Sequence, residues 1–255
     1  MLLTVLSIGS ARIMALPVIL KEQAARFAGQ TILRAEGNSK VAKTRLVGER
    51  VVALRSFGKQ FPIELGGFSI RIHLLMFGSY RIDERKETPL RLALGFADGE
   101  LNFYACSVRY LEGDLDDLYD WRADVMPEQC DPALARRKLR AMPGMPVCDA
   151  LLDQDVFAGV GNIIKNEVLF DIRVHPLSKN GALPARKLRE LLDEARQYSF
   201  EVLEWKKALV LRKHWLAHNK SVCPRDHVPF QRAYLGRTHR RSFFCECCQK
   251  KYLRV

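Results

Sequence analysis

The chain has 255 residues, of which 48% are hydrophobic and 27% charged, which describes a soluble globular protein with one large or two modest domains. Its net charge of +12 predicts a polyanionic partner, with nucleic acid ahead of a membrane surface. No apolar run reaches transmembrane length, and the apolar opening MLLTVLSIGSA has no basic residues before it, so a membrane-spanning protein and a secretory signal are not expected.

The first half of the chain has the pattern of β-structure after one short helix. Residues 1–13 match no pattern and form an N-terminal extension, whereas Pro17 predicts the first turn of a helix. From residue 31 to about residue 112, β-rich runs alternate with turn signals at Gly66-Gly67 and Asp98-Gly99. We therefore predict an antiparallel sandwich or barrel of about eight strands over residues 14–115, with Pro62 at an edge strand or a bulge.

The second half is predicted to be helical. Residues 116–130 are acidic and form a linker to a helical domain over residues 131–215. Asp131 is a candidate helix N-cap with Pro132 at the first helical position, and residues 185–213 have a long amphipathic pattern. A basic Cys/His-rich segment, residues 216–255, completes a two-domain α+β fold.

A glycine-rich turn lies at the centre of the helical half. Gly159-Val160-Gly161 separates two apolar runs, and Asn162 follows at the expected N-cap of a helix. The exposed N–H groups and positive dipole end of such a helix bind a phosphate without a basic side chain. An ordinary helical hairpin with a glycine turn is the alternative, because Gly-x-Gly alone is a weak signal.

Four of the seven cysteines cluster near the C-terminus. Cys223-x3-His227 precedes Cys245-x2-Cys248 by seventeen residues, a spacing that suits a tetrahedral zinc ion held on a hairpin. Cys247 competes with Cys248 for the fourth place. This clustering predicts a structural metal site in a reducing compartment, cytoplasmic or nucleoid-associated, and not a disulfide framework.

The sequence of the central stretch, residues 151–176, resembles a known motif. The segments LLDQ, AGVGN and EVLF, running into a His-Pro pair, resemble the helix–two-turn–helix of the formamidopyrimidine-DNA glycosylase and endonuclease VIII family. The likeness extends from about Val18 to Tyr252 and is closer to the endonuclease VIII branch. It implies a monomeric base-excision repair enzyme, a DNA N-glycosylase and AP lyase, that flips oxidised bases, with pyrimidines favoured, out of double-stranded DNA. Damaged or abasic DNA would lie in a basic cleft between the two domains.

The resemblance implies roles for individual residues. Lys59 and Asn162 would contact DNA phosphates, and Leu75, Met76 and Phe77 would fill the gap left by the flipped base. Arg240, five residues before Cys245, would contact the phosphates flanking the lesion, and a one-residue slip would give that role to Arg241. The family's first zinc pair is usually Cys-x2-Cys, which places Asp226 and not His227 at the second position, so the ligand at this position stays open.

The family's catalytic pair is not found. Family members use an N-terminal proline amine as the nucleophile that forms a Schiff base, followed by a glutamate that moves protons. Counting back from VILKE, these positions fall on Arg12 and Ile13, which cannot act in this way, so the catalytic residues are unknown. Three accounts stay open: a different start of the chain, a non-catalytic relative, or another amine such as that of Lys21.

Two other functions remain open on the sequence. A damaged-DNA or abasic-site binding protein of the same fold would bind the lesion in the same way but would cleave no bond of the DNA. An RNA-binding zinc protein is the third possibility, because helix–two-turn–helix elements and zinc ribbons also occur in RNA-associated proteins.

Overall fold

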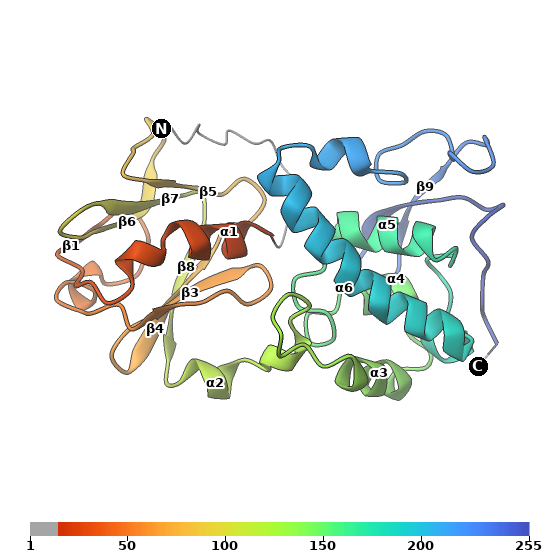
Figure 1. The fold of residues 1–255 in the computed structure, drawn as a ribbon, viewed down its shortest axis with the longest axis horizontal. Helices are drawn as coiled ribbons and strands as arrows, with labels where there is room; N and C mark the ends of the chain where they lie inside the picture. Colours follow the sequence, from red (N-terminus) through yellow and green to blue (C-terminus); the bar gives the residue numbers. More distant parts are fainter. Residues whose placement is uncertain (1–14, 255) are drawn as a thin grey trace. The chain divides into compact units, whose positions relative to one another are not determined.

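The computed structural model describes residues 15–254, which divide into two compact units (Figure 1). Among these residues, the first unit holds Leu16–Tyr119, and the second holds Ala15 and residues 120–254. The division therefore falls inside the acidic segment 116–130. Within residues 15–254, no helix is both long enough and apolar enough to cross a bilayer.

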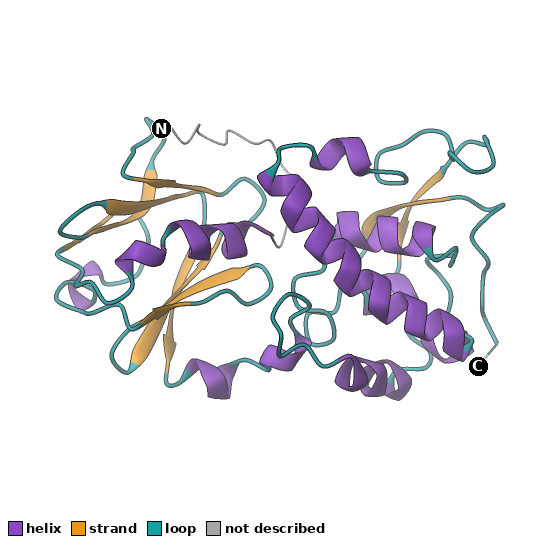
Figure 2. Ribbon diagram, viewed as in Figure 1, coloured by secondary structure: helices purple, strands orange, loops and turns teal. Residues whose placement is uncertain are grey.

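The first unit is a sandwich of two four-stranded sheets, in the orders β1-β6-β7-β5 and β2-β3-β4-β8 (Figures 1 and 2). Every strand pair in it is antiparallel, and its strands form two separate sheets, so this unit is the predicted sandwich and not a barrel. Together with the helices of the second half, this confirms the predicted α+β class. The strands are β1 (Arg34–Glu36), β2 (Ala53–Leu54), β3 (Gln60–Glu64), β4 (Phe68–His73), β5 (Ser79–Ile82), β6 (Leu90–Gly95), β7 (Glu100–Tyr104) and β8 (Ser107–Glu112).

Helix α1 (Ala15–Gln23) and a 3-10 turn (Ala25–Phe27) precede the sandwich, and α2 (Leu115–Leu118) follows it. Alternating side chains of the strands point into one apolar core, which explains the period-two pattern of the sequence. Phe27 closes this core by stacking on Phe96, with 4.5 Å between the ring centroids. The predicted turns at Gly66-Gly67 and Asp98-Gly99 are confirmed, since they join β3 to β4 and β6 to β7.

The prediction for Pro62 is wrong, because β3 is an inner strand of its sheet and its register with β4 is unbroken. Strand β2 explains how the proline is accommodated. It is only two residues long, and its last residue, Leu54, pairs with Ile63. Beyond that pair the carbonyl of Pro62 accepts from the N–H of Arg55 at 2.9 Å. The proline has no N–H to return a second bond on this side, and β2 has already ended there.

The second unit is helical with one β-hairpin (Figure 2). Asp131 caps α3 as predicted, because its carboxylate accepts from the N–H of Ala133 at 2.8 Å. The helices are α3 (Pro132–Ala141), α4 (Val147–Ala150), α5 (Asn162–Asp171) and α6 (Ala185–Lys207), with 3-10 turns at Trp121–Ala123, Asn180–Ala182 and Leu211–His214. The hairpin consists of β9 (Gln231–Leu235) and β10 (Arg240–Phe244).

Helix α5 is the central element of this unit. It contacts α6 on one side and β10 on another, and its residues 163–170 are all buried. The buried Glu167 is satisfied by backbone N–H groups of Leu216, Ala217 and His218, at 2.7–3.2 Å. Burial raises the pKa of Glu167, and these hydrogen bonds oppose that rise. The chain that leaves α6 is thereby bound along α5 on its way to Cys223.

Candidate functional site

The start of α5 differs in one respect from the sequence prediction. The N-cap is Gly161, and Asn162 is the first helical residue, so the prediction of Asn162 as the N-cap is wrong. Gly159 in the preceding turn has φ +102°, a left-handed conformation that favours glycine. With the N-cap one residue earlier, the Asn162 side chain is free of the capping role and donates to the carbonyl of Arg241 at 2.9 Å.

The hairpin register separates the two candidate arginines. Arg241 pairs with Tyr234, and its guanidinium carbon lies 5.4 Å from the centroid of that ring. Arg240 lies on the opposite face, the face that it shares with Ser242 two residues on. The Ser242 hydroxyl accepts from Lys165 of α5 at 2.7 Å, so this face is turned toward α5. Asn162 and Arg240 are thus brought to one region, with Arg241 directed away.

In the first unit, Lys59 lies in a tight turn before β3. Phe57 and Gln60 exchange both backbone hydrogen bonds across this turn, at 2.9 and 3.1 Å, and Gly58 supplies the left-handed φ of +54°. Lys59 itself is half-buried. Gln60 pairs with His73, so the turn with Lys59 and the loop that begins after His73 lie at the same end of β3 and β4.

That loop, between β4 and β5, carries Leu75, Met76 and Phe77, the apolar residues that the resemblance predicts to fill the gap left by a flipped base. The exposed fraction is 48% for Leu75, 42% for Met76 and 71% for Phe77. Packing in the core, the ordinary fate of such a run, is therefore not what these side chains do. Leu75 has φ +49°, which turns the chain at the start of the loop.

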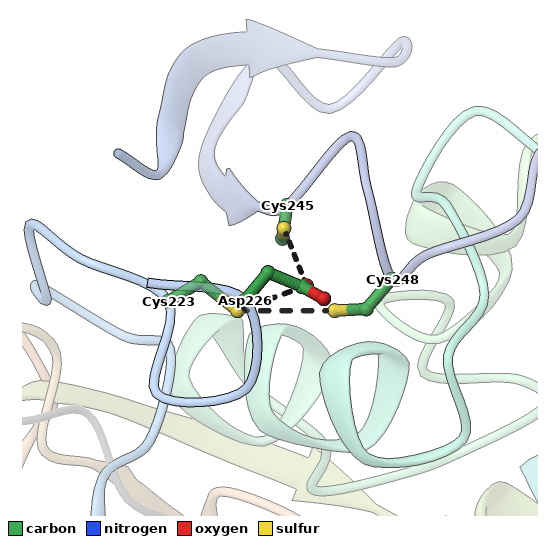
Figure 3. A group of neighbouring side chains, drawn as sticks. All are labelled: Cys223, Asp226, Cys245 and Cys248. Carbon is green, nitrogen blue, oxygen red and sulfur yellow. Dashed lines mark hydrogen bonds between the residues drawn. The ribbon is translucent and has the colours of Figure 1, made fainter. Parts of the chain in front are cut away.

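Three of the four predicted metal ligands lie together with a fourth group (Figure 3). The ligand atoms of Cys223, Asp226, Cys245 and Cys248 are all within 4.8 Å of one another. Asp226 Oδ2 lies 3.2 Å from the sulfur of Cys245 and 3.5 Å from that of Cys223. His227 is not in this group, so its prediction as the fourth member is corrected to Asp226.

The backbone conformation explains why Asp226, and not the neighbouring His227, lies beside the cysteines. His227 has φ +57°, and its N–H donates to the carbonyl of Cys223 at 2.9 Å, which closes a tight turn. The turn leaves Asp226 as the residue that points toward the cysteines (Figure 3). Cys247, the competitor for Cys248, is exposed and outside the group.

The donor set fits a divalent metal ion. Burial raises the pKa of Cys245, and burial with an added hydrogen bond to Asp226 raises the pKa of Cys248 to about 12. The hydrogen bond from Cys245 is the largest of the causes that lower the pKa of Asp226. A bound cation reverses the effect on the thiols, since it stabilises thiolates directly. Three sulfurs and one carboxylate oxygen around a common point match a tetrahedral site.

Two residues that contribute to the site were not expected from the sequence. Asp149 and Lys165 are buried, and both contact the hairpin. The sequence carries a signal for Lys165, because a lysine inside the apolar run NIIKNEVLF needs a polar partner if the helix is buried. Asp149 carries no comparable signal. Arg12 and Ile13, at the family's catalytic positions, lie outside the described residues.

Comparison with known proteins supports the resemblance over both units. Residues 16–109 match the formamidopyrimidine-DNA glycosylase N-terminal domain, and residues 121–211 match the formamidopyrimidine-DNA glycosylase H2TH domain. The solved structure of Lactococcus lactis formamidopyrimidine-DNA glycosylase, bound to DNA that contains an AP site, has the same fold. Its TM-score is 0.81 at 23% identity, over 94% of this chain and 100% of that one.

Curated relatives agree with this assignment. Human endonuclease 8-like 3 is 28% identical over 209 residues, which are 78% of this chain and 34% of that protein, so the chain spans about a third of its length. Bovine endonuclease 8-like 2 is 30% identical over 71% of this chain and 58% of that protein. The DNA-(apurinic or apyrimidinic site) lyase Nei2 of Mycolicibacterium smegmatis is 31% identical over 66% of this chain and 70% of that protein. The chain therefore belongs to the formamidopyrimidine-DNA glycosylase and endonuclease VIII family.

Proposed function

We propose that the chain is a base-excision DNA glycosylase and AP lyase that acts on oxidised bases, pyrimidines favoured, in double-stranded DNA. The observation that carries this proposal is the placement of Arg240 beside the start of α5, where the Asn162 side chain binds the hairpin backbone. A cation next to unpaired helix N–H groups is suited to a DNA phosphate. The names of the relatives, a lyase and endonuclease 8-like proteins, point to the same substrate class.

Residues of the first unit would make DNA contacts of their own. Lys59 would hold a phosphate, and the exposed Leu75, Met76 and Phe77 would enter the duplex where a base is flipped out. Removing the base and cutting the strand then requires an amine. Its lone pair attacks C1′, the base leaves, and the resulting Schiff base permits elimination of the phosphate. The residue that supplies this amine is unassigned.

We also propose that Cys223, Asp226, Cys245 and Cys248 hold a structural zinc ion. The support is the donor set and the position of Cys223 and Cys245, which are buried in an apolar cluster with Phe170 and Phe230. A zinc ion there would fix the base of the hairpin that carries Arg240. Thiolate ligands of this kind favour a reducing compartment.

The test of the enzyme proposal is borohydride trapping of the purified chain on a duplex with one abasic site. A covalent protein–DNA band is expected, since borohydride reduces a Schiff base to a stable amine. Mass spectrometry of the adduct then names the attacking residue. Absence of the band with tight binding retained would replace the lyase by the non-catalytic damage-binding protein. Tighter binding to structured RNA than to the abasic duplex would contradict both.

A further inference from the structure

The turn of the β9–β10 hairpin rests on a buried carboxylate. Asp149, in α4, is 4% exposed. Its Oδ2 accepts from the backbone N–H of Arg237 at 2.8 Å, and its Oδ1 accepts from the N–H and the hydroxyl of Thr238 at 3.0 and 2.9 Å. These three bonds occupy both carboxylate oxygens. They also satisfy two backbone donors in the turn that precedes Arg240.

Gly236 shows how closely the turn sits on this carboxylate. It has φ +70°, and a Cβ built on it would lie 2.4 Å from Asp149 Oδ1. No real Cβ tolerates that distance, so glycine is required both for the backbone conformation and for the contact. Asp149 therefore lies directly against the turn backbone.

The burial of Asp149 is offset by its surroundings. An isolated buried carboxylate is strongly unfavourable, but charge-assisted hydrogen bonds and a nearby cation compensate it. The ammonium of Lys165 interacts electrostatically with Asp149 and with Arg240. The same lysine donates to the Ser242 hydroxyl on β10. One buried cation thus links the carboxylate below the turn to the strand that carries the arginine.

A second anchor holds the hairpin immediately after Arg240. The carbonyl of Arg241 accepts from the Asn162 amide at 2.9 Å, and from Lys165 and Asn166 at 3.4 Å each. The N–H of Phe243 donates to the Asn166 side chain at 3.3 Å. Arg240 therefore lies between two fixed points, the turn at Thr238 and the carbonyl of Arg241. A shift of its backbone would strain or break these hydrogen bonds.

We propose that Asp149 is a positioning residue: by fixing the turn at Arg237 and Thr238, it sets the direction in which Arg240 meets a DNA phosphate. This inference rests on the proposed function, because it gives Arg240 a DNA contact to be positioned for. Asp149 itself would touch no DNA. Its effect on affinity would pass entirely through Arg240, and this dependence distinguishes it from a residue that merely stabilises the fold.

A double-mutant cycle tests this dependence. Affinity for an abasic-analogue duplex is measured by fluorescence anisotropy for the wild type, Asp149→Ala, Arg240→Ala and the double variant. Asp149→Ala is expected to weaken binding about tenfold when Arg240 is present, and less than about twofold when Arg240 is absent. Equal effects in both backgrounds would overturn the proposal. Asp193→Ala, which removes an exposed carboxylate from α6, is the charge-matched control and should leave affinity unchanged.

Hydrogen exchange gives a readout that needs no DNA and tolerates a weakened fold. In Asp149→Asn, which keeps the side-chain volume, one of the two N–H groups of Arg237 and Thr238 faces an amide donor and should exchange about tenfold faster. Gly236→Ala should have the same effect by pushing the turn off the carboxylate. Wild-type exchange in both variants would overturn the anchoring role.

The two proposals fail in different ways. A wild-type chain that does not bind the abasic duplex, or an Arg240→Ala variant that binds it normally, would contradict the proposed function. Exchange at Arg237 and Thr238 would then still decide whether Asp149 anchors the turn. If the wild type binds DNA normally and the losses of affinity in Asp149→Ala and Arg240→Ala simply add in the double variant, only the positioning role of Asp149 would be contradicted.

Discussion

At the scale of single residues, Lys165 is the least ordinary group in the second unit. It is 1% exposed, and burial lowers its pKa to about 8. The titratable groups around it are Cys148 and Asp149 on α4, Arg240 on β10 and His218 on the segment after α6. Burial raises the pKa of the Cys148 thiol to about 11 and lowers the pKa of His218 to about 4, so both are neutral near pH 7. A lysine in this environment is tolerated because it bonds Ser242 and the Arg241 carbonyl.

This pKa predicts a pH dependence of stability. From about pH 8 to pH 10.5 the unfolded chain keeps the Lys165 proton and the folded chain releases it, so this group makes the fold more stable as pH rises. Below pH 8 both states hold the proton, and burying the ammonium costs roughly 3 kcal/mol.

Lys165→Met should remove this contribution. The free energy of unfolding, measured by denaturant titration at pH 7.5 and pH 10, should rise less with pH in the variant than in the wild type. Exposed Lys213→Met is the control and should follow the wild type. The same pH dependence in Lys165→Met and the wild type would contradict the assignment.

Two errors of the sequence prediction, at His227 and at Asp149, come from judging residues by their type alone. Histidine is a commoner zinc ligand than aspartate, which favoured His227, but the left-handed backbone at His227 brings Asp226 to the cysteines. Such a conformation is not visible in the sequence. Asp149 was missed because a lone acidic residue in a helix is usually exposed, and its two partners, Arg237 and Thr238, lie 88 and 89 residues further along the chain.

At the scale of elements, the proposed zinc ion would join the loop of residues 223–227 to the chain just after β10, where Cys245 and Cys248 lie. Cys245→Ser should abolish stoichiometric zinc, because it removes a thiolate ligand, and Asp226→Asn should lower zinc affinity. The measurement is metal content by mass spectrometry after dialysis against a weak chelator.

His227→Asn is the matched control, since asparagine tolerates the left-handed conformation that His227 adopts. It should retain zinc. Loss of zinc from His227→Asn, with Asp226→Asn unaffected, would restore histidine as the fourth ligand.

Elements with strong local signals were predicted well. The paired glycines, Asp98-Gly99 and Asp131-Pro132 marked turns and a helix start that the structure contains. Residues 75–77, which the resemblance predicts to fill the gap left by a flipped base, lie on a loop and are exposed. Pro62 failed because strand order is a long-range property: nothing near QFPIEL shows that its outer neighbour is only two residues long.

At the scale of the whole molecule, the net charge of +12 bears most directly on the proposed binding to DNA. Each phosphate neutralised by a protein cation releases counterions, which contributes about −0.9 to the slope of log K against log salt. With three or more such contacts, affinity for the abasic duplex should fall at least about fortyfold between 50 and 200 mM salt.

Arg240→Ala should make this slope less steep by about 0.9, the contribution of one phosphate contact. Arg241→Ala removes the same charge from the other face of the hairpin and should change the slope less. Anisotropy titrations across the salt range measure both. Equal changes of slope in the two variants would contradict a specific role for Arg240, because they would mean that only the total charge of the hairpin matters.

Helix α5 is fastened at both ends by the chain that holds the cysteine group. The side chain of its first residue, Asn162, donates to the carbonyl of Arg241. At its other end, the carbonyl of Phe170 accepts from the guanidinium of Arg225 at 2.6 Å, and Arg225 is only two residues after Cys223. We therefore expect the helix, the hairpin and the loop of residues 223–227 to open together, as one cooperative unit. Binding of the proposed zinc ion would then also protect the backbone amides of α5, a helix that contributes no ligand.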